Sequence, residues 1–274
     1  EIPLRLVGSE MCIRDRNQAL KINGKMYYFD ESGRLVKDQE FSIYNAEKNM
    51  YTYYKANPDG SLVIGWDEDK RSYYFSDGRC ADGVVQIDGK TYYFENGYQQ
   101  RDCVVASNGF GYYFDEDGNM EKKQEATKDC WFQAGGRWYY IRNGELVKNE
   151  FITVNNKKYY LDYEGKMYHY GWFSVYDSVE DKEFEYYAEE SGNIVTGWYD
   201  GVYYCDENGR RQEGIMRVDG LLYDFAPEMK RNTAEIKDGT LYYFASDGVS
   251  TISQKAPKNG WVFMTENWYY VKNN

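Results

Sequence analysis

Two tryptophans and a tyrosine near the middle of the chain are the residues best suited to hold a ligand. In the stretch WFQAGGRWYY, Trp131, Trp138 and Tyr140 lie on either side of the Gly135-Gly136 pair. Aromatic faces attract organic cations, by about 2 kcal/mol when the pair is desolvated. The same faces can stack on a sugar ring. The residue types therefore predict a site for a quaternary ammonium group or a sugar.

A turn between two strands must bring these rings together. Asp, Asn or Gly followed by Gly tolerates the positive φ angles of a type I′ turn, so such pairs indicate a two-residue β-hairpin. If the two glycines form that turn, Trp131 lies opposite Tyr140, and Trp138 lies on the diagonal from Trp131, within reach of a large side chain. We expect Tyr159 or Tyr160, from the following hairpin, to close the site.

The tyrosine doublet of this stretch recurs along the chain, roughly every 20 residues with some longer intervals. Self-similarity at such a period is typical of stacked supersecondary units. We predict an all-β solenoid of about twelve stacked β-hairpins, a superhelical repeat protein, over residues 17–274. The first tyrosines of the repeats are Tyr27, Tyr53, Tyr73, Tyr92, Tyr112, Tyr139, Tyr159, Tyr186, Tyr203, Tyr223, Tyr242 and Tyr269, and a second tyrosine follows each of them except Tyr223, which precedes Asp224.

Alternation along a strand assigns the two faces of each hairpin. In QIDGKTYYFENG, the Asp88-Gly89 turn should pair Val85 with Tyr92. The first tyrosine and the residue two positions later share a face, which we expect to form the core. The second tyrosine points to the other face. That face either is wet and lines a groove, or packs against the neighbouring hairpin.

Composition limits the partners. The 274 residues include 31 Tyr, 13 Phe and 7 Trp, and the formal charge is −12. An acidic chain repels phosphate backbones and anionic lipids, so we expect no nucleic-acid partner. The sequence has no apolar run of about 18 residues, so we expect no membrane insertion.

Few residues suit catalysis or metal binding. His169 is the one histidine, and neither a G-x-S-x-G nor a C-x-x-C sequence occurs. A zinc site or a histidine-based triad therefore lacks ligands and partners. We expect no catalytic residue, no metal and no cofactor. The five cysteines should be buried or half-buried thiols, and whether Cys103 and Cys130 meet is left open.

Several stretches carry a family resemblance. WFQAGGRWYYIRNGELVKNEF at 131–151, GWYDGVYYCDENG at 197–209 and segments of the type GKMYYFDESG resemble the cell-wall-binding repeats of bacterial surface proteins. That superfamily includes choline-binding modules, the glucan-binding repeats of streptococcal glucosyltransferases and the receptor-binding repeats of clostridial toxins. The resemblance implies ligands between consecutive hairpins. A choline pocket of this family takes two tryptophans from one hairpin and a tyrosine from the next.

Only part of the chain matches that pocket. The resemblance implies a full set at Trp131, Trp138 and the Tyr159-Tyr160 pair, and a second tryptophan pair at Trp261 and Trp268 without a following hairpin. Three more tryptophans keep the Gly-Trp dipeptide but lack the second tryptophan, which favours glucan-binding or toxin-type repeats over a strict choline module. They are Trp66, Trp172 and Trp198, with Ser72, Glu185 and Val202 at the second position.

These observations predict a non-catalytic cell-wall or carbohydrate-binding module of a bacterial surface or secreted protein. Its partners would be cell-wall polysaccharide, glucan or choline-bearing teichoic acid, at an extracellular, cell-surface or cell-wall location. A structural stalk or adhesin spacer without ligand, and toxin-type receptor-binding repeats, are the alternatives. Residues 1–16 lack the repeat pattern, and we expect a spurious or disordered leader. We also expect an enzyme, toxin or adhesin domain upstream, missing from this fragment.

Overall fold

The computed structural model describes residues 16–46 and 49–272, which fall into two compact units. One unit ends at Val147, and the other begins at Lys148. The expected leader, residues 1–16, lies outside the described residues apart from its last position. A single repeat domain over 17–274 stays a prediction.

All regular secondary structure of the described residues is β-strand, as predicted. The first unit contains β1 (Gln18–Ile22), β2 (Lys25–Phe29), β3 (Gln39–Asn45), β4 (Met50–Ala56), β5 (Gly65–Trp66), β6 (Tyr73–Tyr74), β7 (Gly83–Ile87), β8 (Lys90–Glu95), β9 (Tyr98–Gln99), β10 (Cys103–Ser107), β11 (Phe110–Phe114), β12 (Met120–Glu125), β13 (Cys130–Ala134), β14 (Arg137–Arg142) and β15 (Glu145–Leu146). The second unit contains β16 (Glu150–Val154), β17 (Lys157–Leu161), β18 (Gly171–Asp177), β19 (Lys182–Ala188), β20 (Gly197–Tyr199), β21 (Tyr203–Cys205), β22 (Gly214–Val218), β23 (Leu221–Phe225), β24 (Thr233–Lys237), β25 (Thr240–Phe244), β26 (Ile252–Lys255), β27 (Asn259–Met264) and β28 (Asn267–Lys272).

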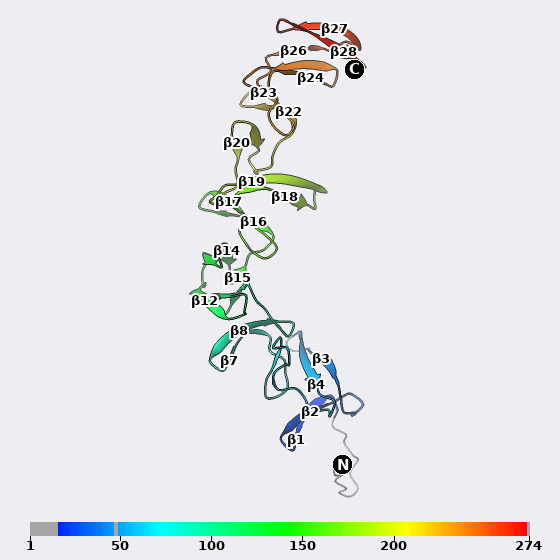
Figure 1. Ribbon diagram of the computed structural model, residues 1–274, viewed down its shortest axis with the longest axis vertical. Helices are drawn as coiled ribbons and strands as arrows, with labels where there is room; N and C mark the ends of the chain where they lie inside the picture. The colour runs from blue at the N-terminus through cyan, green and yellow to red at the C-terminus, as the bar shows by residue number, and fades with distance from the viewer. Residues whose placement is uncertain (1–15, 47–48, 273–274) are drawn as a thin grey trace. The chain divides into compact units, whose positions relative to one another are not determined.

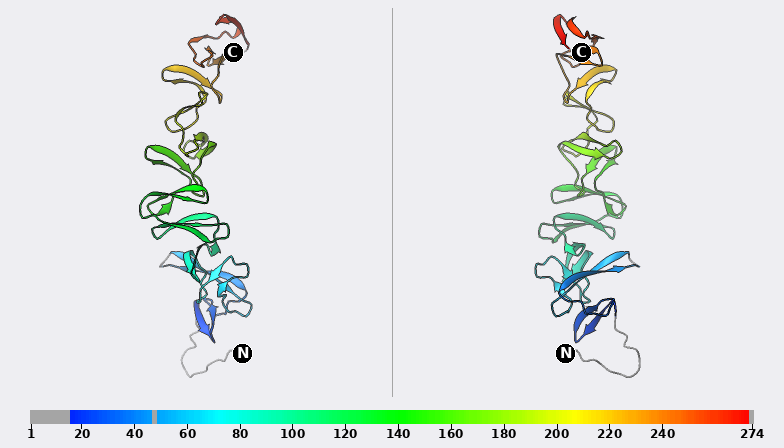
Figure 2. Two further views of the ribbon diagram at one scale, coloured as in Figure 1. Left: turned by 60° about the vertical axis from the view of Figure 1, so that its left-hand side comes forward. Right: turned by 90° about the vertical axis from the view of Figure 1, so that its right-hand side faces the viewer.

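The strands pair as twelve antiparallel sheets, eight with two strands and four with three. In every repeat the first tyrosine lies on the second strand of a hairpin. Figure 1 shows one such hairpin, in which the second strand β19 runs beside β18. Within each unit, successive hairpins follow one another in chain order (Figure 2). The predicted all-β hairpin repeat is therefore confirmed. Superhelical winding of the whole chain stays a prediction.

Glycine-containing turns set the register of the hairpins. At the tip of β7–β8, Asp88-Gly89 has φ angles of 48° and 80°, the left-handed conformation that a type I′ turn needs. Val85 therefore pairs with Tyr92, as predicted, and Ile87 pairs with Lys90.

A second type of turn follows many hairpins and uses a carboxylate. The Asp115 Oδ1 atom accepts hydrogen bonds from the backbone N–H groups of Asp117 and Asn119, at 3.0 and 2.8 Å. These bonds, that from Asn119 above all, lower the pKa of Asp115. The carboxylates of the acidic turns thus stabilise the turns in which they lie. The same turn occurs at Asp30, Asp162 and Asp206.

The core lies between hairpins, and it uses both faces of each hairpin. The residue two positions after the first tyrosine is fully buried in many repeats, as expected, and Phe94 and Phe114 are examples. The second tyrosine is also buried in several repeats: Tyr160, for instance, packs on Phe173 of the next hairpin with ring centroids 5.3 Å apart. Of the two possibilities for that face, packing against a neighbour applies to most repeats. Each core cluster of the described residues joins two consecutive hairpins.

Replacement of a fully buried ring should destabilise the first unit. Phe114 is 0% exposed and stacks near Tyr93 of the preceding hairpin, with centroids 6.1 Å apart. We expect Phe114→Ala to lower the free energy of unfolding by about 3–5 kcal/mol, because it leaves a cavity. Tyr51→Ala, at a ring that is 56% exposed, should cost less than about 1 kcal/mol. Urea denaturation followed by far-ultraviolet circular dichroism measures both, and equal losses would contradict this view of the core.

Candidate functional site

The predicted ring cluster forms on the β13–β14 hairpin. Trp131 pairs with Tyr140 across the strands, and their ring centroids lie 5.0 Å apart at an interplanar angle of 72°. Trp138 lies on the diagonal, 6.1 Å from Trp131 and nearly perpendicular to it at 87°. Its side chain is 41% exposed, whereas Trp131 is half-buried and Tyr140 is buried. Two indoles and a phenol thus meet at a partly open corner.

The opposite face of the same hairpin holds this corner rigid. Phe132 and Tyr139 are buried in the core cluster that the hairpin shares with its predecessor. Gln124 of β12 also donates a hydrogen bond to the backbone carbonyl of Trp131, at 3.1 Å. Burial raises the pKa of Tyr140, and the carboxylate of Asp129 raises it further. A neutral phenol near a carboxylate favours a cationic or hydroxyl-bearing ligand.

Three Gly-Trp tryptophans meet a ring that the sequence pattern did not assign to them. In each case this ring is the first tyrosine of the next hairpin, and it stands edge-on to the indole. The centroid distances lie between 5.0 and 5.1 Å, so these rings fill much of the space between the hairpins. The regular spacing of the doublets was the sequence signal that could have predicted these contacts. The pairs are Trp66 with Tyr92, Trp172 with Tyr203 and Trp198 with Tyr223.

The two tryptophans of the last hairpin, β27–β28, have different partners. Trp261 packs on Tyr270 with centroids 5.0 Å apart, whereas Trp268 packs on Phe263 at 5.1 Å. Both indoles are widely exposed, at 65% and 64%. Phe263 takes the register position that Gln133 has in β13–β14, and it provides the contact for Trp268.

Family models match four segments of the chain. A model described as a choline-binding repeat covers residues 81–124. A model described as a putative cell wall binding repeat covers residues 20–35, 131–144 and 149–167, and the second of these contains the Trp131 corner. These four segments are similar to choline-binding and cell-wall-binding repeats.

The curated relatives of the chain include two streptococcal proteins. Glucosyltransferase-S of Streptococcus mutans is 28% identical in an alignment 249 positions long that covers 85% of this chain and 16% of that protein. Glucosyltransferase-S of Streptococcus downei is 26% identical over 76% of this chain and again 16% of its own length. The chain thus spans about a sixth of the curated relatives it matches. Among solved structures, choline-binding protein F from Streptococcus pneumoniae is similar at 24% identity and a TM-score of 0.40, covering 85% of this chain and 92% of that one.

The β16–β17 hairpin places an ammonium group of the chain itself on the aromatic rings. Lys158 has the register position of Trp138, because it pairs with Thr153 as Trp138 pairs with Gln133. Its Nζ atom lies 4.4 Å from the ring centroid of Phe151 and 5.9 Å from that of Tyr186 in the next hairpin. Both distances are within the cation–π range.

The Lys158 ammonium group is partly desolvated and well held. Nζ donates a hydrogen bond to the backbone carbonyl of Asn208, at 2.7 Å. Burial lowers the pKa of Lys158. Phe151 takes the position of Trp131, and Tyr186 is the first tyrosine of the following repeat. The ring arrangement between consecutive hairpins therefore has the dimensions to hold an ammonium group.

The next repeat of the same unit also carries an internal cation. Glu185 stands where the second tryptophan would be, and its carboxylate pairs with Arg211. The guanidinium carbon of Arg211 lies 5.4 Å from the ring centroid of Trp172. Glu213 also pairs with this guanidinium, at 2.7 Å. An acidic residue at the second position thus helps to keep a cation of the chain near the indole.

The two tyrosines expected to close the Trp131 corner lie on β17, in the second unit. Tyr160 packs against Phe151 and Phe173, and its hydroxyl group donates a hydrogen bond to Asn149 at 2.7 Å. Tyr159 is half-buried. Closure of the corner by either residue stays a prediction.

Histidine, cysteine and clustered acidic residues are the other candidates for chemistry among residues 16–46 and 49–272. This part of the chain contains no group of three or more His, Cys, Asp or Glu that could hold a metal ion. No disulfide joins the four cysteines in it, and Cys205 is buried while the others are half-buried. His169 is exposed between β17 and β18. A helix that could cross a membrane is likewise absent from these residues.

Removal of the internal cation should leave a vacant ammonium site. We expect Lys158→Ala to bind tetramethylammonium with a Kd on the order of tens of millimolar, because caged cation–π attraction is worth about 2 kcal/mol. Shifts of the Phe151 and Tyr186 ring signals in NMR spectra measure the binding. Lys157→Ala is the matched control, because the exposed Lys157 points to the other face of β17. Indistinguishable titrations of the two variants would contradict the expectation.

Proposed function

We propose that the chain is a non-catalytic module that binds cell-wall carbohydrate through aromatic side chains between its hairpins. In this proposal the module belongs to a secreted or cell-surface bacterial protein, in which it is attached to an enzyme, toxin or adhesin domain. Cell-wall-binding repeats in four segments and the similarity to two glucosyltransferases support it. The proposed partners are cell-wall polysaccharide, glucan or choline-bearing teichoic acid.

The observation that carries the proposal is the open corner at Trp131 and Trp138. Two indoles at 87° present one face and one edge to the same volume, and the Trp138 side chain is partly exposed. A sugar ring can stack on the exposed indole while its hydroxyl groups reach solvent. A quaternary ammonium group fits the same corner by cation–π attraction. Glucan and choline are therefore the two ligands to compare.

Several weak sites would have to act together. A single ring platform on a shallow surface binds weakly, and linked sites raise the effective concentration without new contacts. Trp261 and Trp268, both widely exposed, supply a second candidate platform in the last hairpin. Trp66, Trp172 and Trp198 are weaker candidates, because tyrosines of the following hairpins already pack on them.

A structural stalk or spacer is the second candidate function. The second unit favours this function, because the side chains of Lys158 and Arg211 already lie against the aromatic rings where a ligand cation would bind. A spacer needs the packing between hairpins but no open aromatic corner.

Tryptophan fluorescence can separate the two functions. We expect titration with soluble α-glucan, choline or isolated cell walls to change the emission of the wild-type protein. Trp131→Ala should weaken the response at least tenfold, because truncation of a central aromatic anchor typically costs about 2 kcal/mol or more. Tyr163→Ala, at a turn tyrosine that is 76% exposed, serves as control. An unchanged response in Trp131→Ala would rule out this corner, and a wild-type protein without any response would favour the spacer.

A further inference from the structure

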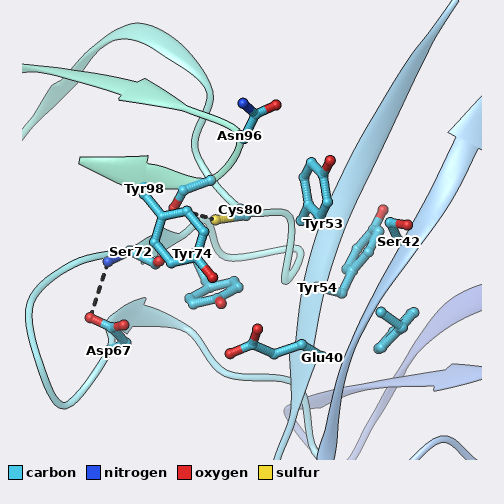
Figure 3. Close-up of a pocket in the computed structure, with 12 residues that line it drawn as sticks. Glu40, Ser42, Tyr53, Tyr54, Asp67, Ser72, Tyr74, Cys80, Asn96 and Tyr98 are labelled. Atoms are coloured by element: carbon cyan, nitrogen blue, oxygen red, sulfur yellow. Dashed lines mark hydrogen bonds between the residues drawn. The ribbon is translucent and has the colours of Figure 1, made fainter. Parts of the chain in front are cut away.

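A separate pocket of about 290 Å³ lies in the first unit, where three successive hairpins meet (Figure 3). Glu40 and Tyr53 come from the β3–β4 hairpin, and Asp67 and Tyr74 come from the β5–β6 hairpin. The turn before β9 and its first residue, Tyr98, contribute the third wall. None of the tryptophans discussed above lines this pocket, so it is distinct from the Trp131 corner.

The walls of the pocket are fixed by bonds between hairpins. The backbone N–H of Cys80 donates to the carbonyl of Tyr53 at 2.8 Å, and the Cys80 thiol lies 3.3 Å from the carbonyl oxygen of Gly97. Gly97 has a φ of +83°, and a Cβ atom there would lie 3.1 Å from the Cys80 sulfur. Glycine therefore permits this close approach. The pocket is shaped before any ligand arrives, which reduces the entropic cost of binding.

The charged side chains that line the pocket are acidic. Glu40 and Asp67 both reach it, and the lining contains no Lys, Arg or His. Lys55 pairs with Glu40 from outside the lining, at 3.2 Å. Burial raises the pKa of Tyr74, and the charges of Glu40 and Asp67 raise it further, so both carboxylates act on the interior. A cationic group is favoured in this field.

Asp67 is held in position by its own turn. Its Oδ1 atom accepts hydrogen bonds from the backbone N–H groups of Arg71 and Ser72, at 2.6 and 3.1 Å. In the view of Figure 3, Glu40 and Asp67 lie along one edge of the pocket, and Asn96 lies at the opposite edge. The two edges thus differ in chemistry: one offers carboxylates, and the other offers an amide. A ligand with a cationic end and a hydroxyl-bearing end would match both.

We propose that this pocket binds a sugar ring that carries a protonated amino group. The ammonium group would lie between Glu40 and Asp67, where a primary ammonium can donate hydrogen bonds that a quaternary one cannot. The ring would stack on Tyr53 or Tyr98, both of which are partly exposed at the rim. The ring hydroxyls would reach Asn96. This site goes beyond the proposed function, because it recognises a primary ammonium group through two carboxylates and uses none of the tryptophans.

Calorimetric titration of the full chain with three sugars tests the proposal. We expect glucosamine to bind at least tenfold more tightly than glucose or N-acetylglucosamine, which lack the cationic group. Methylammonium, which lacks the ring, should also bind at least tenfold more weakly than glucosamine. Absence of glucosamine binding, or equal binding of glucose or of methylammonium, would overturn the assignment.

Two carboxylates of one turn provide a matched pair of variants. Asp67→Asn keeps an oxygen that can accept from Arg71 and Ser72, so the turn should survive, and we expect about a tenfold loss of glucosamine affinity. Asp69→Asn changes the charge equally at an exposed position outside the pocket and should have no such effect. Circular dichroism checks that both variants are folded. Equal affinities in folded Asp67→Asn and Asp69→Asn would refute the role of Asp67.

A further pair separates this pocket from the Trp131 corner. Loss of both stacking rings, in the double variant Tyr53→Ala/Tyr98→Ala, should abolish glucosamine binding and leave the fluorescence response to glucan or choline intact. Trp131→Ala should do the reverse. Loss of glucosamine binding in Trp131→Ala would mean that the sugar binds at the corner, and the proposal would then be wrong even if the carbohydrate-binding function held.

Discussion

Ring packing between consecutive hairpins is the interaction on which the rest of the structure depends. A two-stranded hairpin is at best marginally stable alone in water, because one ribbon cannot bury its own faces. Here each hairpin gives rings to a neighbour, as Tyr160 does to Phe173. Tyrosine suits this role, since its ring can be buried while its hydroxyl group forms a hydrogen bond at the rim. The hydroxyl group of Tyr160, for example, donates a hydrogen bond to the side chain of Asn149. The strongly aromatic composition follows from the need to repeat this contact.

The same packing limits where a ligand can bind. An indole that the next hairpin's tyrosine covers edge-on, as Tyr92 covers Trp66, has less surface for a ligand. An interface that contains Lys158 already has its cation. Binding capacity therefore depends on the rings that neighbouring side chains leave uncovered, and the partly exposed Trp138 is such a ring. Stability and recognition compete for the same aromatic faces.

Local sequence patterns predicted the structure within each hairpin, but they predicted few of the contacts between hairpins. The Asp88-Gly89 turn and strand alternation were enough for the pairing of Val85 with Tyr92, because both are properties of one hairpin. The tyrosine partners of the Gly-Trp tryptophans come from the next hairpin, and no local rule names them. The contact of Lys158 could not be predicted from its own hairpin either, since a lysine on a strand face suggests solvent, whereas rings beneath it allow partial burial. The pocket at Glu40 involves three hairpins, so the repeat pattern contains no sign of it.

The turn chemistry of the repeat also explains how an acidic pocket can arise without disturbing the fold. Asp115 and Asp67 both accept backbone N–H groups through one oxygen, and this fixes the carboxylate while it closes the turn. At most turns the carboxylate then faces solvent, where its charge is screened. Asp67 instead lines the pocket between neighbouring hairpins, so the same charge acts on a volume with tyrosine walls. A folding device of the repeat thus becomes a recognition element through its surroundings alone.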